Sequence, residues 1–180
     1  MHYSEKKATQ AAALLLQMGG GTANGYVLLK LLYLSDRKSL IEIGRTISAD
    51  RMYSLPDGPV PSNAYDHIRY SGDYWGKYIS GRYGHDVKLI ADPGTEDLSE
   101  YECRVLKDIY SEFGKYSYGQ MWAYSHTKLP EHKDPKGSSI PIDPFEILRV
   151  AGYTEDEIAQ ARSVASSEFL LDNPEQLPAR

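Results

Sequence analysis

Few side chains in this chain are placed for nucleophilic or metal chemistry. Nucleophilic catalysis needs a base beside a serine or cysteine, and the single cysteine, Cys103, has no histidine near it in sequence. No two histidines have the i, i+4 spacing of a zinc-protease helix, and no Cys-x-x-Cys motif is present. The histidines are His2, His67, His85, His126 and His132. We therefore expect no catalytic residue, metal ion or other cofactor; the alternative is a metal site assembled in three dimensions.

A glycine run near the N-terminus is the one candidate for a phosphate-binding loop. Gly19, Gly20 and Gly21 follow a segment of good helix formers. A P-loop ends in Gly-Lys-Ser/Thr, and here Gly21 is followed directly by Thr22 without the lysine. The run is better interpreted as a flexible turn between two helices.

Asp36 is a carboxylate that helical spacing places on an apolar face. It shares that face with Leu29, Leu40 and Ile43. A carboxylate there is costly unless it is paired or hydrogen-bonded. The candidate partners are Arg45, Arg51 or backbone N–H groups of the loop that follows the helix. With an arginine partner, Asp36→Leu would be tolerated better than loss of the arginine.

A second stripe on the same segment combines aromatic and cationic groups. Tyr26, Lys30, Tyr33 and Arg37 recur at helical spacing. They could form a partner-binding face, or a solvated edge whose long side chains cover the core.

A helix over 26–43 is the most strongly predicted element and must position both stripes. Leucines and other apolar groups lie nearly all round its axis, which is typical of a buried helix. Asn24 is a suitable N-cap, and Gly44 is suited to end the helix. The fold expected is therefore mainly α, a compact helical domain with a central buried helix and a small β-hairpin.

The hairpin is expected over residues 73–92, between a proline-rich loop and the second half of the chain. Residues 74–80 and 86–91 are rich in aromatic and branched side chains, and a glycine-containing turn connects them. The three prolines and the Asp-Gly pair within residues 55–61 exclude a helix there. Such a constrained loop loses little entropy on binding. Ser62 is expected to cap a short helix that reaches Tyr70.

Further helices are predicted after the hairpin. A capping box begins the helix over 99–113, and a second helix spans 116–127. His126 lies near the end of that helix, where its ring can hydrogen-bond an end carbonyl. Residues 131–139 are polar and are expected to form an exposed loop. Two short helices follow: one starts at Asp143, and the other has an apolar stripe at Ile158, Ala161, Ala165 and Phe169.

Composition favours a protein-binding role in the cytoplasm. The chain has 180 residues, which fits one domain. One cysteine, no signal peptide and no apolar run of roughly 20 residues predict a cytoplasmic protein without a membrane span. The net charge of −5 disfavours broad contact with nucleic acid. The chain has 15 tyrosines and 3 phenylalanines. This excess favours a protein interface, or a core in which the tyrosine rings are buried and their polar ends reach its polar edge.

Four motifs in order give the sequence a resemblance to a known family. The run from Lys30 to Arg37 resembles the signature helix of the Panacea (SocA-like antitoxin) domain. The next two family elements are similar to Gly44-Arg45-Thr46-Ile47 and to the Gly-Pro-Val-Pro-Ser loop that begins at Gly58. The last family element is similar to Ser125-His126, which precedes Pro130. The matching positions are Asp36, Arg45, Asp57, Gly58, Pro59, Pro61, Ser62, Tyr65 and His126.

This resemblance implies an antitoxin of a bacterial or phage toxin–antitoxin pair that neutralises its toxin by direct binding. One relative delivers its toxin to a protease, so a proteolytic adaptor is an alternative. An enzyme with a site near Asp36, Arg37, Asp57 and His126 is a further alternative. We expect one Panacea-like domain over 1–180, with a core at about 6–130 and a helical extension at about 141–172. Direct DNA binding is not expected, because almost nothing precedes the first helix.

Overall fold

The computed structural model describes residues 2–172, with side chains up to residue 165. The helices are α1 (Glu5–Met18), α2 (Gly25–Ile43), α3 (Ser62–Tyr70), α4 (Glu100–Phe113), α5 (Tyr118–Thr127), α6 (Pro144–Val150) and α7 (Glu155–Asp172), with a 3₁₀ turn at Trp75–Lys77. The strands are β1 (Thr22–Asn24), β2 (Met52–Leu55), β3 (Gly58–Pro61), β4 (Ile79–Gly81), β5 (Asp86–Leu89) and β6 (Ile140–Pro141). The described part of the chain is therefore mainly helical, with a small β component.

Helix α2 begins and ends where the local signals place it. The side chain of Asn24 accepts hydrogen bonds from the first free backbone N–H groups of the helix. Gly44 adopts the left-handed conformation, with φ +72°, and its N–H binds the Leu40 carbonyl. Every side chain from Tyr26 to Asp36 is buried, and α2 packs against α1, α4, α5, α6 and β3.

The predicted hairpin is partly right. Strands β4 and β5 pair antiparallel, with Ile79 opposite Leu89. The first strand is shorter than expected because the buried Trp75 begins a 3₁₀ turn. On its other edge, β5 pairs with β1, a strand that follows the glycine turn and was not predicted.

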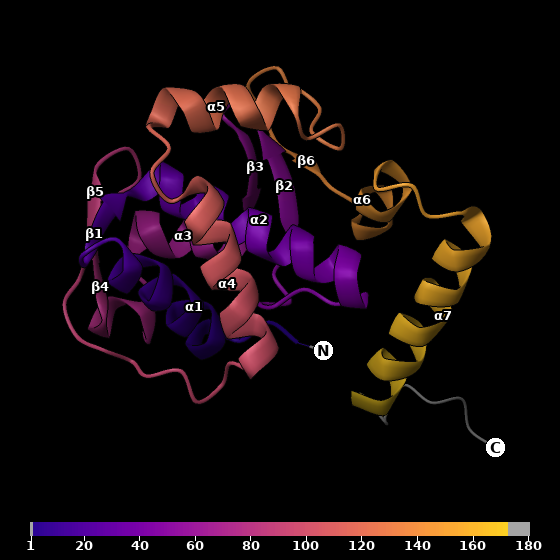
Figure 1. Cartoon of the computed structure of the whole chain (residues 1–180), viewed down its shortest axis with the longest axis horizontal. Helices are drawn as coiled ribbons and strands as arrows, with labels where there is room; N and C mark the ends of the chain where they lie inside the picture. The colour runs from indigo at the N-terminus through magenta and orange to yellow at the C-terminus, as the bar shows by residue number, and fades with distance from the viewer. Residues whose placement is uncertain (1, 173–180) are drawn as a thin grey trace.

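A second sheet, in the order β3-β2-β6, was also not predicted as a sheet. Its strand β3 comes from the proline-rich segment, with Pro59 opposite Ser54 and Pro61 opposite Met52. Proline lacks a backbone N–H, and β3 tolerates two prolines because it is an edge strand. Figure 1 shows α5 running over the end of this sheet, and α2 and α5 both pack against β3.

Helix α3 spans the predicted residues, but its cap differs from the prediction. Ser62 is the first helical residue, and no side chain of the preceding residue caps the helix. The carboxylate of Asp50 performs this role from the previous loop, accepting from the backbone N–H groups of Asn63 and Ala64 at 3.0 Å each. A capping residue so far away in sequence has no local signature.

The C-terminal helices lie at one side of the molecule (Figure 1). Helix α6 is anchored by two buried side chains, Ile147 and Leu148, and packs against α2. Ile158 of α7 is buried as predicted, Ala161 is half-buried and Ala165 is exposed, while Phe169 lies outside the described side chains. No helix within residues 2–172 combines the length and apolar character needed to cross a bilayer.

Candidate functional site

The turn at Pro56–Gly58 connects β2 to β3 and includes the first residue of β3. Side chains from two helices, α2 and α5, hydrogen-bond to the backbone of this segment. From α2, the Tyr26 hydroxyl donates to the Asp57 carbonyl at 2.7 Å, and Lys30 Nζ donates to the Pro59 carbonyl at 2.7 Å. From α5, His126 Nε2 lies 3.1 Å from the Pro56 carbonyl. Three side chains distant in sequence thus fix the backbone of this turn and of Pro59 directly after it.

Gly58 allows this close approach. Its φ is +96°, and a Cβ built there would lie 2.9 Å from the Cβ of Ser125 and 3.2 Å from Lys30 Nζ. Any side chain would therefore meet both a strained backbone and occupied space. The glycine lets the turn rest directly on α2 and α5.

Lys30 lies under this turn with only 1% of its surface exposed. Burial lowers the pKa of its amine to about 7, and the nearby Asp57 carboxylate partly opposes that shift. The amine also lies 4.8 Å from the centre of the Tyr26 ring. Its hydrogen bond to the Pro59 carbonyl, directly after the turn, gives it a positioning role.

The Asp57 side chain is surrounded by phenol groups from other elements. Tyr83 donates to Oδ2 at 3.1 Å, and the Tyr118 hydroxyl lies 3.5 Å from Oδ1. Burial and the Asp57 carboxylate both raise the pKa of these two phenols, so they remain protonated donors. Tyr26 and Tyr65 complete the ring cluster, with centroids 4.5 Å from Tyr118 and 5.0 Å from Tyr83 respectively.

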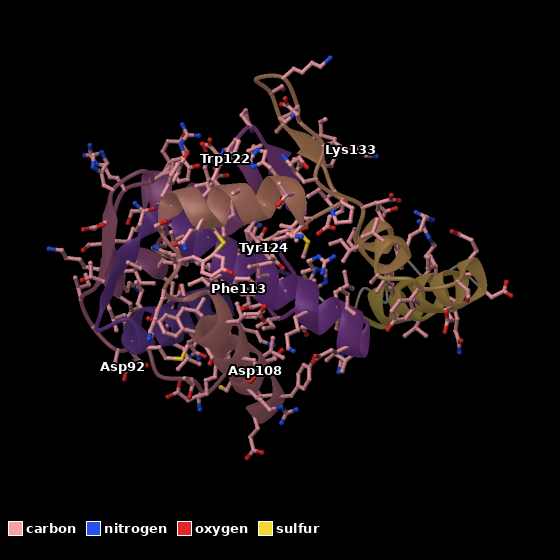
Figure 2. All side chains as sticks on the ribbon, turned by 45° about the horizontal axis from the view of Figure 1, so that its top comes forward. Asp92, Asp108, Phe113, Trp122, Tyr124 and Lys133 are labelled. Carbon is pink, nitrogen blue, oxygen red and sulfur yellow. The ribbon has the colours of Figure 1, made fainter. Side chains whose placement is uncertain are left out.

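This cluster continues to the surface along α5. Trp122 stacks on His126 at 4.0 Å between ring centroids, and His126 contacts the turn. Figure 2 shows Trp122 on the outer side of α5, whereas Tyr124 lies on the inner side toward Phe113. Tyr118 and Trp122 keep 48% and 42% of their surface exposed. We call the surface formed by Pro56, Asp57, Tyr65, Tyr83, Tyr118 and Trp122 the aromatic face.

The stripe expected to face a partner lies instead mostly inside the protein. Tyr26, Lys30 and Tyr33 are buried, and Arg37 is half-buried. Arg37 Nε donates to Oε1 of Glu131 at 2.7 Å, and the Tyr33 hydroxyl donates to the same oxygen at 2.8 Å. The helix is covered by residues distant in sequence, which periodicity does not reveal.

Sequence reasoning missed Glu131, because it begins a segment interpreted as an exposed loop. Its carboxylate is completely buried and pairs with Arg37. The available signal was Arg37 itself, since a guanidinium cannot lose its charge and is stabilised by a carboxylate where it is partly buried.

Asp36 is satisfied by the loop after α2 and by neither candidate arginine. Its Oδ1 accepts from the N–H groups of Ile47 and Ser48 at 2.7 and 3.0 Å, and its Oδ2 accepts from Ser48 Oγ at 2.6 Å. The arginine-pairing prediction is therefore wrong, and the backbone alternative describes the site. Burial still raises the pKa of Asp36 to about 6.

The four residues of the alternative enzyme site bind different partners. Asp36 binds the loop at 47–48, Arg37 binds Glu131, and Asp57 accepts from tyrosines. The ring nitrogens of His126 face two backbone carbonyls, at Trp122 and Pro56. Among the side chains that the structure describes, up to residue 165, no group of three or more from His, Cys, Asp and Glu could hold a metal ion.

A family model described as "Antitoxin SocA-like, Panacea domain" matches residues 28–130. The match covers more than half of the chain and includes Lys30, the Pro56–Gly58 turn and His126. It leaves out α1, α6 and α7. No curated protein and no solved structure shows significant similarity to the chain.

Proposed function

We propose, from the premise that this chain belongs to the SocA-like Panacea-domain antitoxin family, that it neutralises a toxin protein by binding it directly. The observation that carries this proposal is the aromatic face, which is built on a turn held by Lys30 and His126 from the family-matched region and by Tyr26 just before it. The protein acts as a binding module in the cytoplasm and catalyses no reaction.

The chemistry of the aromatic face supports protein binding. Large aromatic side chains dominate the energy of protein interfaces, above all where rigid neighbours hold them in place. Tyr118 and Trp122 are half exposed, while His126, Tyr26 and Asp57 fix their positions. Little side-chain entropy remains to be lost when a partner covers them.

The polar groups beneath the face are already used to hold it. His126 contacts the Pro56 carbonyl in the turn, Lys30 contacts the Pro59 carbonyl directly after it, and Asp57 accepts from phenols. A general base must be within reach of a substrate proton. These groups instead support a structural role for the site.

The experiment is co-expression of the chain with the product of the adjacent gene in a growth assay. Wild-type protein should restore growth, and Trp122→Ala should lose protection, with binding of the purified toxin weakened about tenfold or more. Ile90→Ala is the matched control, because Ile90 is at least as exposed as Trp122 and directly follows the end of β5, whereas Tyr83 of the aromatic face precedes the start of that strand.

Two results would count against the proposal. The first is an adjacent gene product that is harmless, or that stays toxic in the presence of the wild-type chain. The second is equal protection by Trp122→Ala and wild type. Measuring the toxin's half-life in the same cells separates the mechanisms, since direct inhibition leaves it unchanged and a proteolytic adaptor shortens it.

A further inference from the structure

A groove lies between the end of α2 and helix α7, on a part of the molecule separate from the aromatic face. Two hollows of about 590 and 310 Å³ share four lining residues, Gly44, Arg45, Ala161 and Ala165, and so form one continuous groove. The larger hollow lies between the end of α2 and α7, and the smaller also contacts α6.

The walls of this groove are largely apolar and open to solvent. Ile43 at the end of α2 is 44% exposed, and Val164 of α7 is 54% exposed. Leu40 and Phe145 line the smaller hollow. An exposed apolar hollow of this kind is typical of a surface that binds a partner.

Arg45 supplies a charge at the mouth of the groove, and its backbone is fixed. Ser39 Oγ donates to the Arg45 carbonyl at 2.6 Å, and the next residues of the loop bind Asp36. Its side chain is exposed and lines both hollows, as well as a third of about 460 Å³. Among residues 2–165, no hydrogen bond or ion pair engages the Arg45 guanidinium.

The acidic groups that line these hollows have other partners. Asp50 binds the first turn of α3, and Glu157 binds Thr154 at the start of α7. Glu102 pairs with Lys7, and Asp97 pairs with Lys6. Arg45 is therefore the charge on this groove that remains available for an outside carboxylate.

We propose that this groove binds a segment of the toxin that presents an apolar side chain next to a carboxylate, and that Arg45 pairs with that carboxylate. The proposal rests on the proposed function. Arg45 lies in the family-matched region, whereas α6 and α7 lie outside it. In this arrangement Arg45 supplies the charge contact, and the C-terminal helices supply the apolar wall that selects the toxin.

The test measures the affinity of the purified full-length chain for the adjacent gene's product by calorimetry. Arg45→Glu and Val164→Asp should each weaken binding tenfold or more. Lys107→Glu is the matched control, because it makes the same change of charge at an exposed position on α4 and should alter binding less than twofold. Circular dichroism should show that all variants remain folded.

A charge reversal adds a second readout. A toxin variant in which the contacting Asp or Glu is replaced by Arg should regain affinity for Arg45→Glu. If Arg45→Glu binds the toxin with an affinity within twofold of the wild type, the proposed role of the groove is overturned and the proposed function still stands. Absence of binding by the wild-type chain would instead overturn the proposed function.

Discussion

Lys30 and Asp36 are ionisable side chains on α2 that the structure buries almost completely, with 1% and 3% of their surfaces exposed. Each is satisfied by a segment outside the helix. Lys30 donates to the strand after the Pro56–Gly58 turn, and Asp36 accepts from the loop after α2. The two residues therefore fix the two segments that display the aromatic face and Arg45.

Replacing Asp36 should show that it serves as an acceptor for three donors. Asp36→Leu leaves two backbone N–H groups and the Ser48 hydroxyl without their partner, and should lower the free energy of unfolding by about 3 kcal/mol or more. Asp36→Asn keeps an acceptor oxygen and should cost less. Urea denaturation of both variants measures the difference; equal stability of the two would contradict this role.

Lys30 should make stability depend on pH. Its pKa falls to about 7 in the folded protein, so between that pH and the usual lysine pKa the unfolded chain binds more protons than the folded one. Stability should therefore rise with pH across this window and level off below pH 7, where Lys30 is protonated in both the folded and the unfolded chain. From pH 7 to pH 9, the wild type should gain about 2 kcal/mol relative to Lys30→Met.

Urea denaturation of both proteins at pH 7 and pH 9 provides this measurement. Lys30→Met keeps an unbranched side chain of similar length, so the comparison cancels the titration of other groups. A stability difference that does not change between the two pH values would show that Lys30 stays charged when folded.

At the scale of elements, the β2–β3 turn depends on close contact with α2 and α5. The edge strand β3 is too short to hold its conformation alone, and its support comes from Tyr26, Lys30 and His126. The rigidity of the aromatic face is thus a property of three packed elements together.

Gly58→Ala should disrupt this packing. The new methyl group meets Ser125 and Lys30, and the backbone has a positive φ, so we expect a loss of about 2–4 kcal/mol. Gly137→Ala is a matched control, because Gly137 has φ +94° and no atom within 4 Å of its built Cβ. Thermal unfolding should show the larger loss for Gly58→Ala. Equal losses would mean that backbone strain alone accounts for the effect.

At the scale of the whole molecule, the described C-terminal helices join the body through a few buried contacts. Ile147 of α6 is completely buried against the core. The Tyr153 hydroxyl, just before α7, donates to the Ile41 carbonyl of α2 at 2.6 Å. These contacts connect the region outside the family match to the region inside it.

Ile147→Ala tests whether both regions unfold together. In a single cooperative unit, the cavity should lower the stability of the whole chain by about 2–5 kcal/mol, and far-UV circular dichroism and tyrosine fluorescence should show one coincident transition. Two separate transitions would show that the expected single domain is in fact two folding units.

The motifs around the candidate site could be predicted, but most of its exposed part could not. Gly58 and His126 belong to the family motifs that the sequence displays, but the contacts of Gly58 with Ser125 and of His126 with Pro56 are known only from the structure. Tyr118 and Trp122 had no comparable signal, because their exposure depends on how α5 lies over β3.

The sequence by itself determined those helix ends whose caps are local, since caps and apolar periodicity act within a few residues. Helix α2 and the capping box of α4 match their predicted limits, whereas α3 is capped from a distant loop. Tertiary structure alone decided which face of α2 is covered. Periodicity groups Lys30, Tyr33 and Arg37 on one side, but their partners Pro59 and Glu131 are 29 and about a hundred residues away. Pairing over such distances depends on packing of the whole chain, so no local pattern records it.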